Sequence, residues 1–317
     1  MARSRSITGP YETHPQKHLL TARFAPDSPL QRTGPGQYVE TPEGEAYHTY
    51  LVGRPLTGPR GNFCALGRET GIAACEWRAD GWLYLKGGGL VPPVSVPMDA
   101  VTLPDLALSR DFSGPELPPE FQWLRTPEPG RIFALTGQTL RRVGRESLGS
   151  WFEQSLLARR QEHHADHAAA VFHADPPSWQ QAIGLTTYYN RTKFHAALIS
   201  REPGIGRCLR LISCLGDWPG EALTLSAPVP LPAQDIRLEV RVTGARQQFY
   251  WATVAGNAQP FGPELDASLI SDEGGRGEHA SFTGAFVGIL AYDMTGQGWS
   301  AEVTRFDYSP LTMPEQA

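Results

Sequence analysis

The 317-residue sequence lacks the features that mark membrane and nucleic-acid-binding proteins. No apolar run approaches the roughly 18–20 residues that a membrane-spanning helix needs. The net charge is −5, whereas a nucleic-acid or anionic-membrane partner normally leaves a basic footprint, so we expect neither partner. Residues 1–10 are polar and no apolar segment follows them. We therefore expect no secretion signal and a cytoplasmic protein.

Cysteine is also scarce. The four cysteines are Cys64, Cys75, Cys208 and Cys214, and no two of them have the CxxC spacing of a metal knuckle or a redox pair. Four reduced, buried thiols are the expected state.

Sustained helical periodicity is rare as well, and the alternation of half-buried strands takes its place. In residues 236–242, the apolar side chains of Ile236, Leu238, Val240 and Val242 should face a core, with Arg237, Glu239 and Arg241 facing outward. The 33 glycines and 28 prolines supply turns, so the sequence predicts an all-β protein. Further strands are expected at residues 47–52, 72–77, 82–85, 132–135, 150–158, 168–172, 182–189, 194–199, 222–225, 248–254, 286–292 and 301–306.

The strand rhythm breaks in residues 86–119, which are rich in glycine and proline. We assign residues 1–105 to an N-terminal piece, residues 106–119 to a linker and residues 120–317 to a second domain. The many short strands of the second domain predict a two-sheet jelly-roll sandwich.

A series of short strings spans nearly the whole chain in a fixed order. They are ARSRSITGPYE (2–12), VETPEGE (39–45), GRP (53–55), LGRET (66–70), EW (76–77), DGW (80–82), GRESL (144–148), QSLLARRQ (154–161), GL (184–185), YYN (188–190) and FTGAFVG (282–288). Together they resemble the β-xylosidase branch of glycoside hydrolase family 43.

The resemblance implies the last blades of a five-bladed β-propeller, followed by a concanavalin A-like sandwich. It also implies inverting hydrolysis of O-glycosyl bonds in xylo-oligosaccharides by an Asp base and a Glu acid. In the family these residues and a third acid, an Asp, precede the string at residues 2–12, so no catalytic residue is carried over to this chain. Residues 1–105 have room for about two blades at ~40–45 residues each. We expect an N-terminally truncated form that is inactive by itself.

Two residues match positions of the family's sugar pocket. Arg68 matches an arginine whose guanidinium offers a fixed fork of donors to hydroxyls and carboxylates, the alternative being a surface ion pair with Glu69. Phe282 matches a loop aromatic at the pocket wall, the alternative being ordinary sandwich packing. Pro35 stands where the family usually has a histidine near a bound metal ion, so an axial calcium is doubtful and no cofactor is expected.

Other conspicuous residues have structural interpretations. His163, His164 and His167 resemble a metal cluster, but a polar turn between two strands is favoured. Core packing is favoured over sugar stacking for four aromatic residues, namely Tyr188, Tyr189, Trp179 and Trp251. Capping of turns and strand ends is expected for Asp80, Asp111, Glu116 and Asp293.

Three hypotheses remain open from the sequence. The first is a β-xylosidase or α-arabinofuranosidase acting on small xylo- or arabino-oligosaccharides. The second is a non-catalytic carbohydrate-binding or structural β-sandwich module. The third is half of a split enzyme, completed by a missing propeller segment. A homo-oligomer is also possible.

Overall fold

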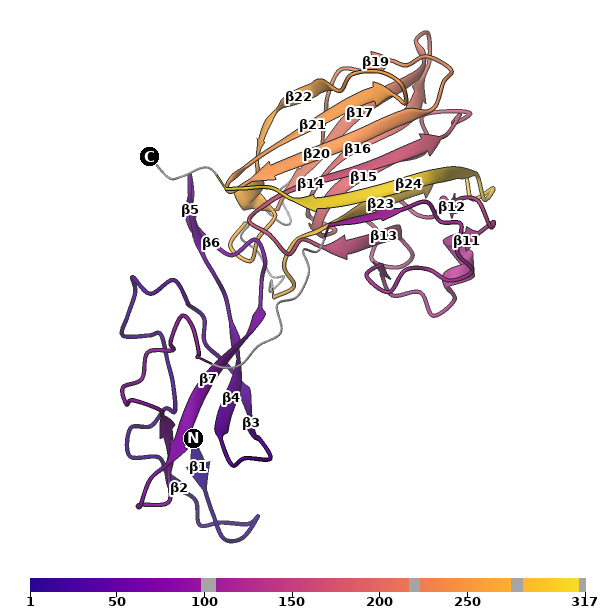
Figure 1. Cartoon of the computed structure of the whole chain (residues 1–317). Coiled ribbons are helices and arrows are strands. Elements are labelled where there is room, and N and C mark those ends of the chain that lie inside the picture. The colour runs from indigo at the N-terminus through magenta and orange to yellow at the C-terminus, as the bar shows by residue number, and fades with distance from the viewer. Residues whose placement is uncertain (98–106, 217–222, 275–281, 314–317) are drawn as a thin grey trace. The chain divides into compact units, whose positions relative to one another are not determined.

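The computed structural model describes residues 1–97, 107–216, 223–274 and 282–313 (Figure 1). The chain divides into two compact units, the first formed by Met1–Pro55 and Gly67–Leu103, and the second by Leu56–Leu66 and Pro104–Ala317. The helical segments among the described residues are two short 3₁₀ turns, Pro129–Arg131 and Ala267–Leu269, so the all-β prediction is confirmed. No helix in these ranges is long and apolar enough to cross a membrane.

The second unit is a sandwich of two antiparallel sheets, each of eight strands in the described residues. One sheet has the order β10 (Gln122–Trp123), β13 (Ser155–Arg160), β23 (Phe286–Asp293), β15 (Gln181–Asn190), β16 (Lys193–Glu202), β17 (Gly206–Leu215) and β18 (Thr224–Leu225), with β19 (Val229–Pro230) also paired to β17. The other has the order β11 (Phe133–Leu135), β12 (Leu140–Val143), β24 (Ser300–Pro310), β14 (Ala165–His173), β20 (Ile236–Thr243), β21 (Arg246–Thr253) and β22 (Gln259–Asp266), with β9 (Leu108–Arg110) also paired to β24.

The two C-terminal strands, β23 and β24, occupy interior positions of the two sheets. Strand β23 lies between β13 and β15, and β24 lies between β12 and β14. Each therefore pairs with strands that come much earlier in the sequence. Such non-consecutive pairing is the crossover pattern of a jelly roll, in which long connections close two sheets over one core.

The alternating segment at residues 236–242 has the predicted register. Ile236, Leu238 and Val240 are completely buried and Val242 nearly so, in the core shared by the two sheets. The charged residues occupy the other face of β20, as expected. Glu239 differs from the expectation in one respect, because it is only 5% exposed although it lies on that outer face.

The sheet that contains β15 is buried on both faces. Its outer face carries a second apolar cluster that includes Tyr188, Phe194 and Leu290. A side chain at Gly184 would place its Cβ 1.9 Å from the carbonyl oxygen of Ala197, so the close approach of these strands requires glycine there.

Burial on both faces explains why the sequence did not predict β17. Its residues, GRCLRLISCL, are buried almost throughout and show no clean alternation. Strands covered on both faces lose the period of two on which the prediction rested. The strand expected at residues 150–158 begins only at Ser155, because the Ser150 amide closes a turn onto the Ser147 carbonyl oxygen at 3.0 Å.

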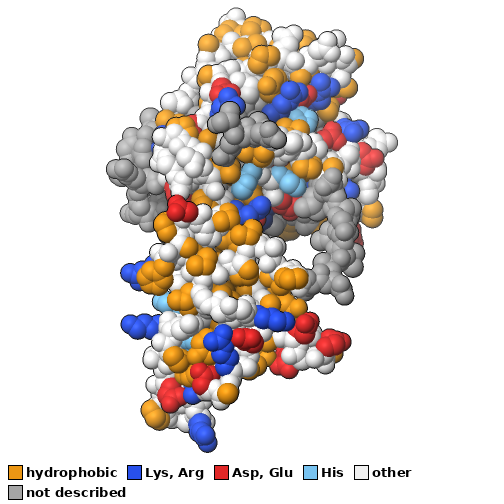
Figure 2. Space-filling view, turned by 60° about the vertical axis from the view of Figure 1, so that its left-hand side comes forward, with side chains coloured by type: hydrophobic (Ala, Val, Ile, Leu, Met, Phe, Trp, Pro, Cys, Tyr) orange, Lys and Arg blue, Asp and Glu red, His pale blue; other side chains and the backbone are white. Residues whose placement is uncertain are grey.

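The first unit contains one four-stranded antiparallel sheet, which is the size of a propeller blade. Its order is β3 (Gly36–Glu40), β4 (Ala46–Val52), β7 (Glu69–Trp77) and β8 (Leu83–Leu85), and a separate hairpin pairs β1 (Ala2–Arg3) with β2 (Glu12–Thr13). Figure 2 shows apolar side chains on the surface of this unit, whose exposed apolar residues include Tyr38, Val39 and Trp77. In the described residues the sheets do not close into a ring.

A hairpin from the middle of the N-terminal region belongs to the second unit. It comprises β5 (Leu56–Gly58) and β6 (Gly61–Phe63). The Cys64 amide donates to Oε2 of Glu273 at 2.7 Å, and the Ala285 amide donates to the carbonyl oxygen of Ala65 at 2.7 Å. Residues 56–66 therefore pack with the sandwich, although they lie inside the range 1–105.

The four cysteines are all buried, as predicted, and they form no disulfide bond with one another.

Truncation of a core side chain in β20 should destabilise the second unit strongly. We expect Leu238→Ala to cost about 2–5 kcal/mol, because it removes buried methyl groups and leaves a cavity between the sheets. Val254→Ala, a matched truncation of an exposed side chain just after β21, should stay within about 0.5 kcal/mol. Calorimetric unfolding of the three proteins measures the difference, and equal effects of the two substitutions would contradict the assigned register.

Candidate functional site

Arg68 lies in the first unit, immediately before β7, and is partly buried. Its neighbour Glu69 receives hydrogen bonds from Arg54 on both carboxylate oxygens, at 2.7 and 2.9 Å. The hydrogen bond to Glu69 raises the pKa of Arg54. Glu69 is thus paired with Arg54.

A recess of about 250 Å³ opens beside this ion pair, lined by Arg54, Glu69, Tyr50 and Ile72 among others of the first unit. The Tyr50 hydroxyl is buried and has no hydrogen-bond partner in the described structure, and burial raises its pKa. The guanidinium of Arg54 and the carboxylate of Glu69 can exchange hydrogen bonds with a polyhydroxylated ligand in this recess, whereas the Tyr50 hydroxyl is too buried to reach one. Sequence reasoning missed Tyr50, since nothing in the string around it marks an unsatisfied hydroxyl.

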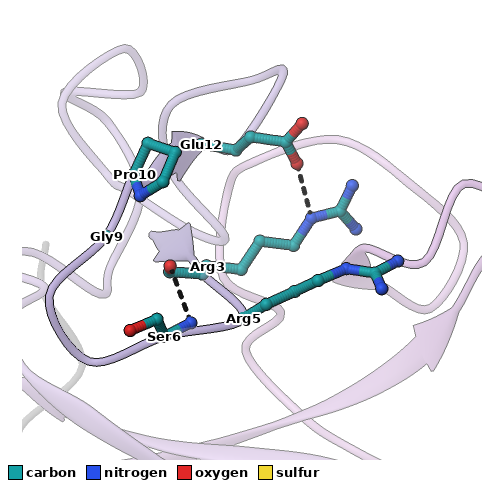
Figure 3. Close-up of a pocket in the computed structure, with 7 residues that line it drawn as sticks. Arg3, Arg5, Ser6, Gly9, Pro10 and Glu12 are labelled. Carbon is teal, nitrogen blue, oxygen red and sulfur yellow. Dashed lines mark hydrogen bonds and ion pairs between the residues drawn. The ribbon is translucent and has the colours of Figure 1, made fainter.

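A second recess of the first unit, about 620 Å³, is formed by the N-terminal hairpin (Figure 3). Arg3 bonds Glu12 at 2.9 Å and the carbonyl oxygen of Gly81 at 2.6 Å, and its guanidinium lies 4.0 Å from the centre of the Trp82 ring. Figure 3 shows Arg5 extended, with no bond to the other residues drawn. Arg3 therefore connects the segments at residues 2–12 and 80–82 by direct contacts. Both segments thus have a role in the structure of the first unit.

Phe282 lies in the second unit, on the segment that leads into β23. It is 64% exposed and lies outside the sandwich core. Tyr189 fixes both ends of the surrounding loop, because its hydroxyl donates to Asp272 and accepts the Thr283 amide at 2.8 Å. Burial, with help from Asp272, raises the pKa of Tyr189. The Lys193 ammonium adds a hydrogen bond to the Ser271 carbonyl oxygen at 3.3 Å.

The two predicted pocket residues thus fall in different units, and their roles in sugar binding stay predictions. Pro35 is exposed, and its carbonyl oxygen accepts the Leu51 amide at 2.9 Å. No group of three histidine, cysteine or acidic side chains within the described ranges could hold a metal ion.

The histidine-rich string is in part the predicted turn between two strands, because His163 and His164 lie in the bend between β13 and β14. Asp166 and His167 lie in β14, where strand pairing continues past the expected loop. The imidazole of His163 bonds the Tyr308 hydroxyl at 3.1 Å, and that of His167 bonds Glu239 at 3.1 Å. These side chains therefore serve separate contacts.

Glu239 is the buried centre of a cluster of charged and polar side chains. His167 and then Arg237, which bonds it at 2.8 Å, lower its pKa to about 2. Arg241 contributes a longer bond at 3.4 Å. Three cationic or polar neighbours explain why a carboxylate can be covered on an outer sheet face.

The scattered acids mostly cap turns, as predicted. Asp80 accepts the Trp82 amide at 3.0 Å, Asp111 the Ser113 amide at 3.1 Å, and Asp293 the Trp299 amide at 2.8 Å. The Tyr84 hydroxyl, and after it the Trp82 amide, lower the pKa of Asp80, and the Ser113 amide lowers that of Asp111. The pKa of Asp293 is also lowered despite its burial. Glu116 is the exception, because it lies in an exposed bend without a side-chain hydrogen bond in the described structure.

Three of the four aromatic residues expected in the core are there. Tyr188 and Tyr189 are buried, and Trp251 packs against the core. The prediction was wrong for Trp179, which is 52% exposed. The two prolines just before Trp179 were the available signal, since they predict a loop and not a strand.

Comparison with known families matches both units. Residues 109–309 match the beta xylosidase C-terminal concanavalin A-like domain, and residues 1–83 match the glycosyl hydrolases family 43. The two matches place the chain among family 43 proteins that carry a C-terminal concanavalin A-like sandwich. The chain belongs to glycoside hydrolase family 43.

Individual relatives align with almost the whole chain. Xylosidase/arabinosidase 43B of Humicola insolens is 42% identical over 99% of this chain and 59% of its own length. The putative beta-xylosidase of Escherichia coli K12 is 36% identical over 98% of this chain and 60% of its own length. The crystal structure of a xylan beta-1,4-xylosidase from Bacillus halodurans C-125 has a TM-score of 0.87 at 33% identity, covering 97% of this chain and 59% of the other. The chain thus spans about three fifths of the length of these relatives.

Asp166 provides a pH-dependent test of the sandwich. It is completely buried, Oδ2 accepts a bond from Gln161 at 2.9 Å, and Oδ1 has no partner in the described structure. Burial raises its pKa from 3.8 to about 7. Because the folded state holds a proton that the unfolded state releases, this stabilisation is complete below pH 3.8 and is lost as the pH rises through about 7.

Asparagine cannot ionise, so the stability of Asp166→Asn should not fall with pH for this reason. We therefore expect the free energy of unfolding of Asp166→Asn, relative to that of the natural protein, to increase by roughly 1–3 kcal/mol from pH 5 to pH 8. Denaturant unfolding at the two pH values measures this gain. Glu264→Gln, an exposed carboxyl on β22, is the control and should leave the pH profile unchanged. Identical profiles for Asp166→Asn and the natural chain would contradict the account.

Proposed function

We propose that this chain works in the hydrolysis of terminal xylosyl or arabinofuranosyl units from short xylo-oligosaccharides. In this proposal Arg68 and Phe282 contact the sugar, and the general acid and base come from propeller residues outside this chain. The observation that carries the proposal is the match of both units to family 43 across nearly the whole chain. The names of the relatives include both xylosidase and arabinosidase, so both sugars remain candidates.

Three acids of the first unit support the second part of the proposal. A general acid works best with a pKa near the working pH, and it must reach the leaving oxygen. Glu12 is paired with Arg3, Glu69 is paired with Arg54, and the pKa of Asp80 is lowered. In the second unit, Asp166 has the raised pKa that an acid needs, but it is completely buried and cannot meet a substrate.

A sugar-binding module without catalysis is the second candidate. It is favoured by the same engaged carboxylates, since binding needs donors and an aromatic surface but no proton transfer. The two candidates predict different results when the rest of the propeller is supplied. The hydrolase should then turn over substrate, whereas the sugar-binding module should not.

The test is release of nitrophenol from nitrophenyl β-xyloside and α-arabinofuranoside. The purified chain should show no appreciable turnover, because each missing acid or base removes about 10²–10⁴ in rate. Co-expression with the propeller portion of a relative that precedes the matched region should restore release. In that complex Arg68→Ala should lower the rate by about 10²-fold or more.

Arg23→Ala, a substitution of an exposed arginine of the first unit, is the control and should leave the restored rate unchanged. Turnover by the chain alone at ordinary enzyme rates, abolished by one carboxylate substitution within it, would overturn the proposal. Sugar binding without turnover in the complex would favour the binding module.

A further inference from the structure

A recess of about 530 Å³ lies at one end of the sandwich, at the opposite end of β15 from the Phe282 segment. It is formed by the loop that joins β14 to β15 and by the turn that joins β16 to β17, and its walls include Pro177, Trp179, Arg201, Glu202 and Ile205. Trp179 is 52% exposed and Ile205 45% exposed. Two apolar side chains are thus presented to solvent at the rim of one hollow.

The backbone around Trp179 is held in place. Its carbonyl oxygen accepts the Tyr292 hydroxyl at 3.4 Å, and Ser178 fixes the next turn by accepting the Gln180 amide on its hydroxyl at 3.2 Å. Pro176 and Pro177 restrict the preceding backbone, and the Pro176 carbonyl oxygen accepts Nε of Arg201 at 2.7 Å. An aromatic ring on so constrained a loop loses little conformational freedom when a ligand covers it.

Trp179 differs from the other exposed tryptophans of the described chain. The indole N–H of Trp77 donates to Tyr38, and that of Trp123 donates to the Thr126 carbonyl oxygen. The ring of Trp151 is covered by Arg191, whose guanidinium lies 3.6 Å from its centre. Within the described ranges, Trp179 has neither a side chain stacked on its ring nor an acceptor for its indole N–H.

The charges at the recess are balanced. Arg201 pairs with Asp175 at 2.6 Å, and Glu202 pairs with Arg210 at 2.8 Å. Two such pairs leave no net charge to attract an anion or a cation. They still offer carboxylate oxygens and guanidinium N–H groups to an uncharged ligand that carries hydroxyls.

We propose that this recess binds one xylopyranosyl unit of a xylo-oligosaccharide, with a sugar face on the Trp179 ring and hydroxyls on Arg201 and Glu202. A xylopyranose has C–H groups on its ring faces and hydroxyls around its edge, which matches an aromatic floor with a polar, neutral rim. The choice of xylose rests on the proposed function, whereas the platform itself rests on the contacts above.

This site is separate from the loop that carries Phe282. Trp179 precedes β15 at the end where Gln181 pairs with Asp293, and the Phe282 segment leads into the other end, where Tyr188 pairs with Phe286. A ten-residue strand spans roughly 30 Å. The recess therefore anchors an oligosaccharide at a distance from that loop.

The test uses the full chain with ¹⁵N-labelled tryptophan, because each indole N–H gives one resolved NMR signal. The signal missing from Trp179→Ala identifies Trp179, and it should shift most when xylohexaose is added to the natural chain. Trp179→Ala should bind xylohexaose about tenfold or more weakly, which corresponds to about 1.4 kcal/mol. Trp151→Ala, the matched exposed tryptophan, and Arg68→Ala should keep the Trp179 shift.

An unshifted Trp179 signal at the highest soluble xylohexaose concentration would overturn the inference. So would equal affinity of Trp179→Ala and the natural chain, or shifts that Arg68→Ala abolishes. Trp179→Phe assigns the signal if the alanine variant does not fold. The outcome is independent of turnover, so a shifted Trp179 signal with an inactive complex would support this site while refuting the catalytic proposal.

Discussion

The shared core between the two sheets is the constraint on which the second unit depends. Each inward position of β20 is occupied by an apolar side chain that packs against residues of the facing sheet, such as Ile183 and Leu185. A slip of one residue would turn Arg237 and Arg241 into that core, at several kcal/mol for each unpaired charge. The register therefore fixes where each strand ends, and with it the positions of the loops that carry Trp179 at one end of β15 and Phe282 at the other.

The hairpin at residues 56–66 extends this unit to a segment distant in the chain. Main-chain groups of Cys64 and Ala65 bond Glu273 and Ala285, which flank the loop before β23. Phe63 and Cys64 are buried, so the attachment combines hydrogen bonds with apolar contact. The sandwich thus includes a hairpin whose last residue lies two positions before Arg68. Arg68 itself belongs to the first unit.

Strand alternation predicted the fold class and the inward face of β20, because one face of that strand meets the core and the other carries charges. It could not predict β17, because both faces of that strand are covered. Nor could it predict the burial of Glu239, which depends on a hydrogen bond with His167, 72 residues earlier in the sequence. Residue spacing gave no candidate site. Arg68 and Phe282 came from the family resemblance, which the comparisons support at the level of the family. The exposure of Trp179 was predictable from its prolines, but its uncovered ring and the ion pairs beside it depend on tertiary contacts.

The central structural claim is that residues 56–66 fold as part of the sandwich. Hydrogen exchange followed across a denaturant titration tests it most directly, because the amides of Cys64 and Ala285 both donate across this attachment. The account predicts that peptides covering residues 61–66 lose protection together with β15 and β23. Loss of protection together with β4 and β7 of the first unit, while the sandwich strands remain protected, would contradict it.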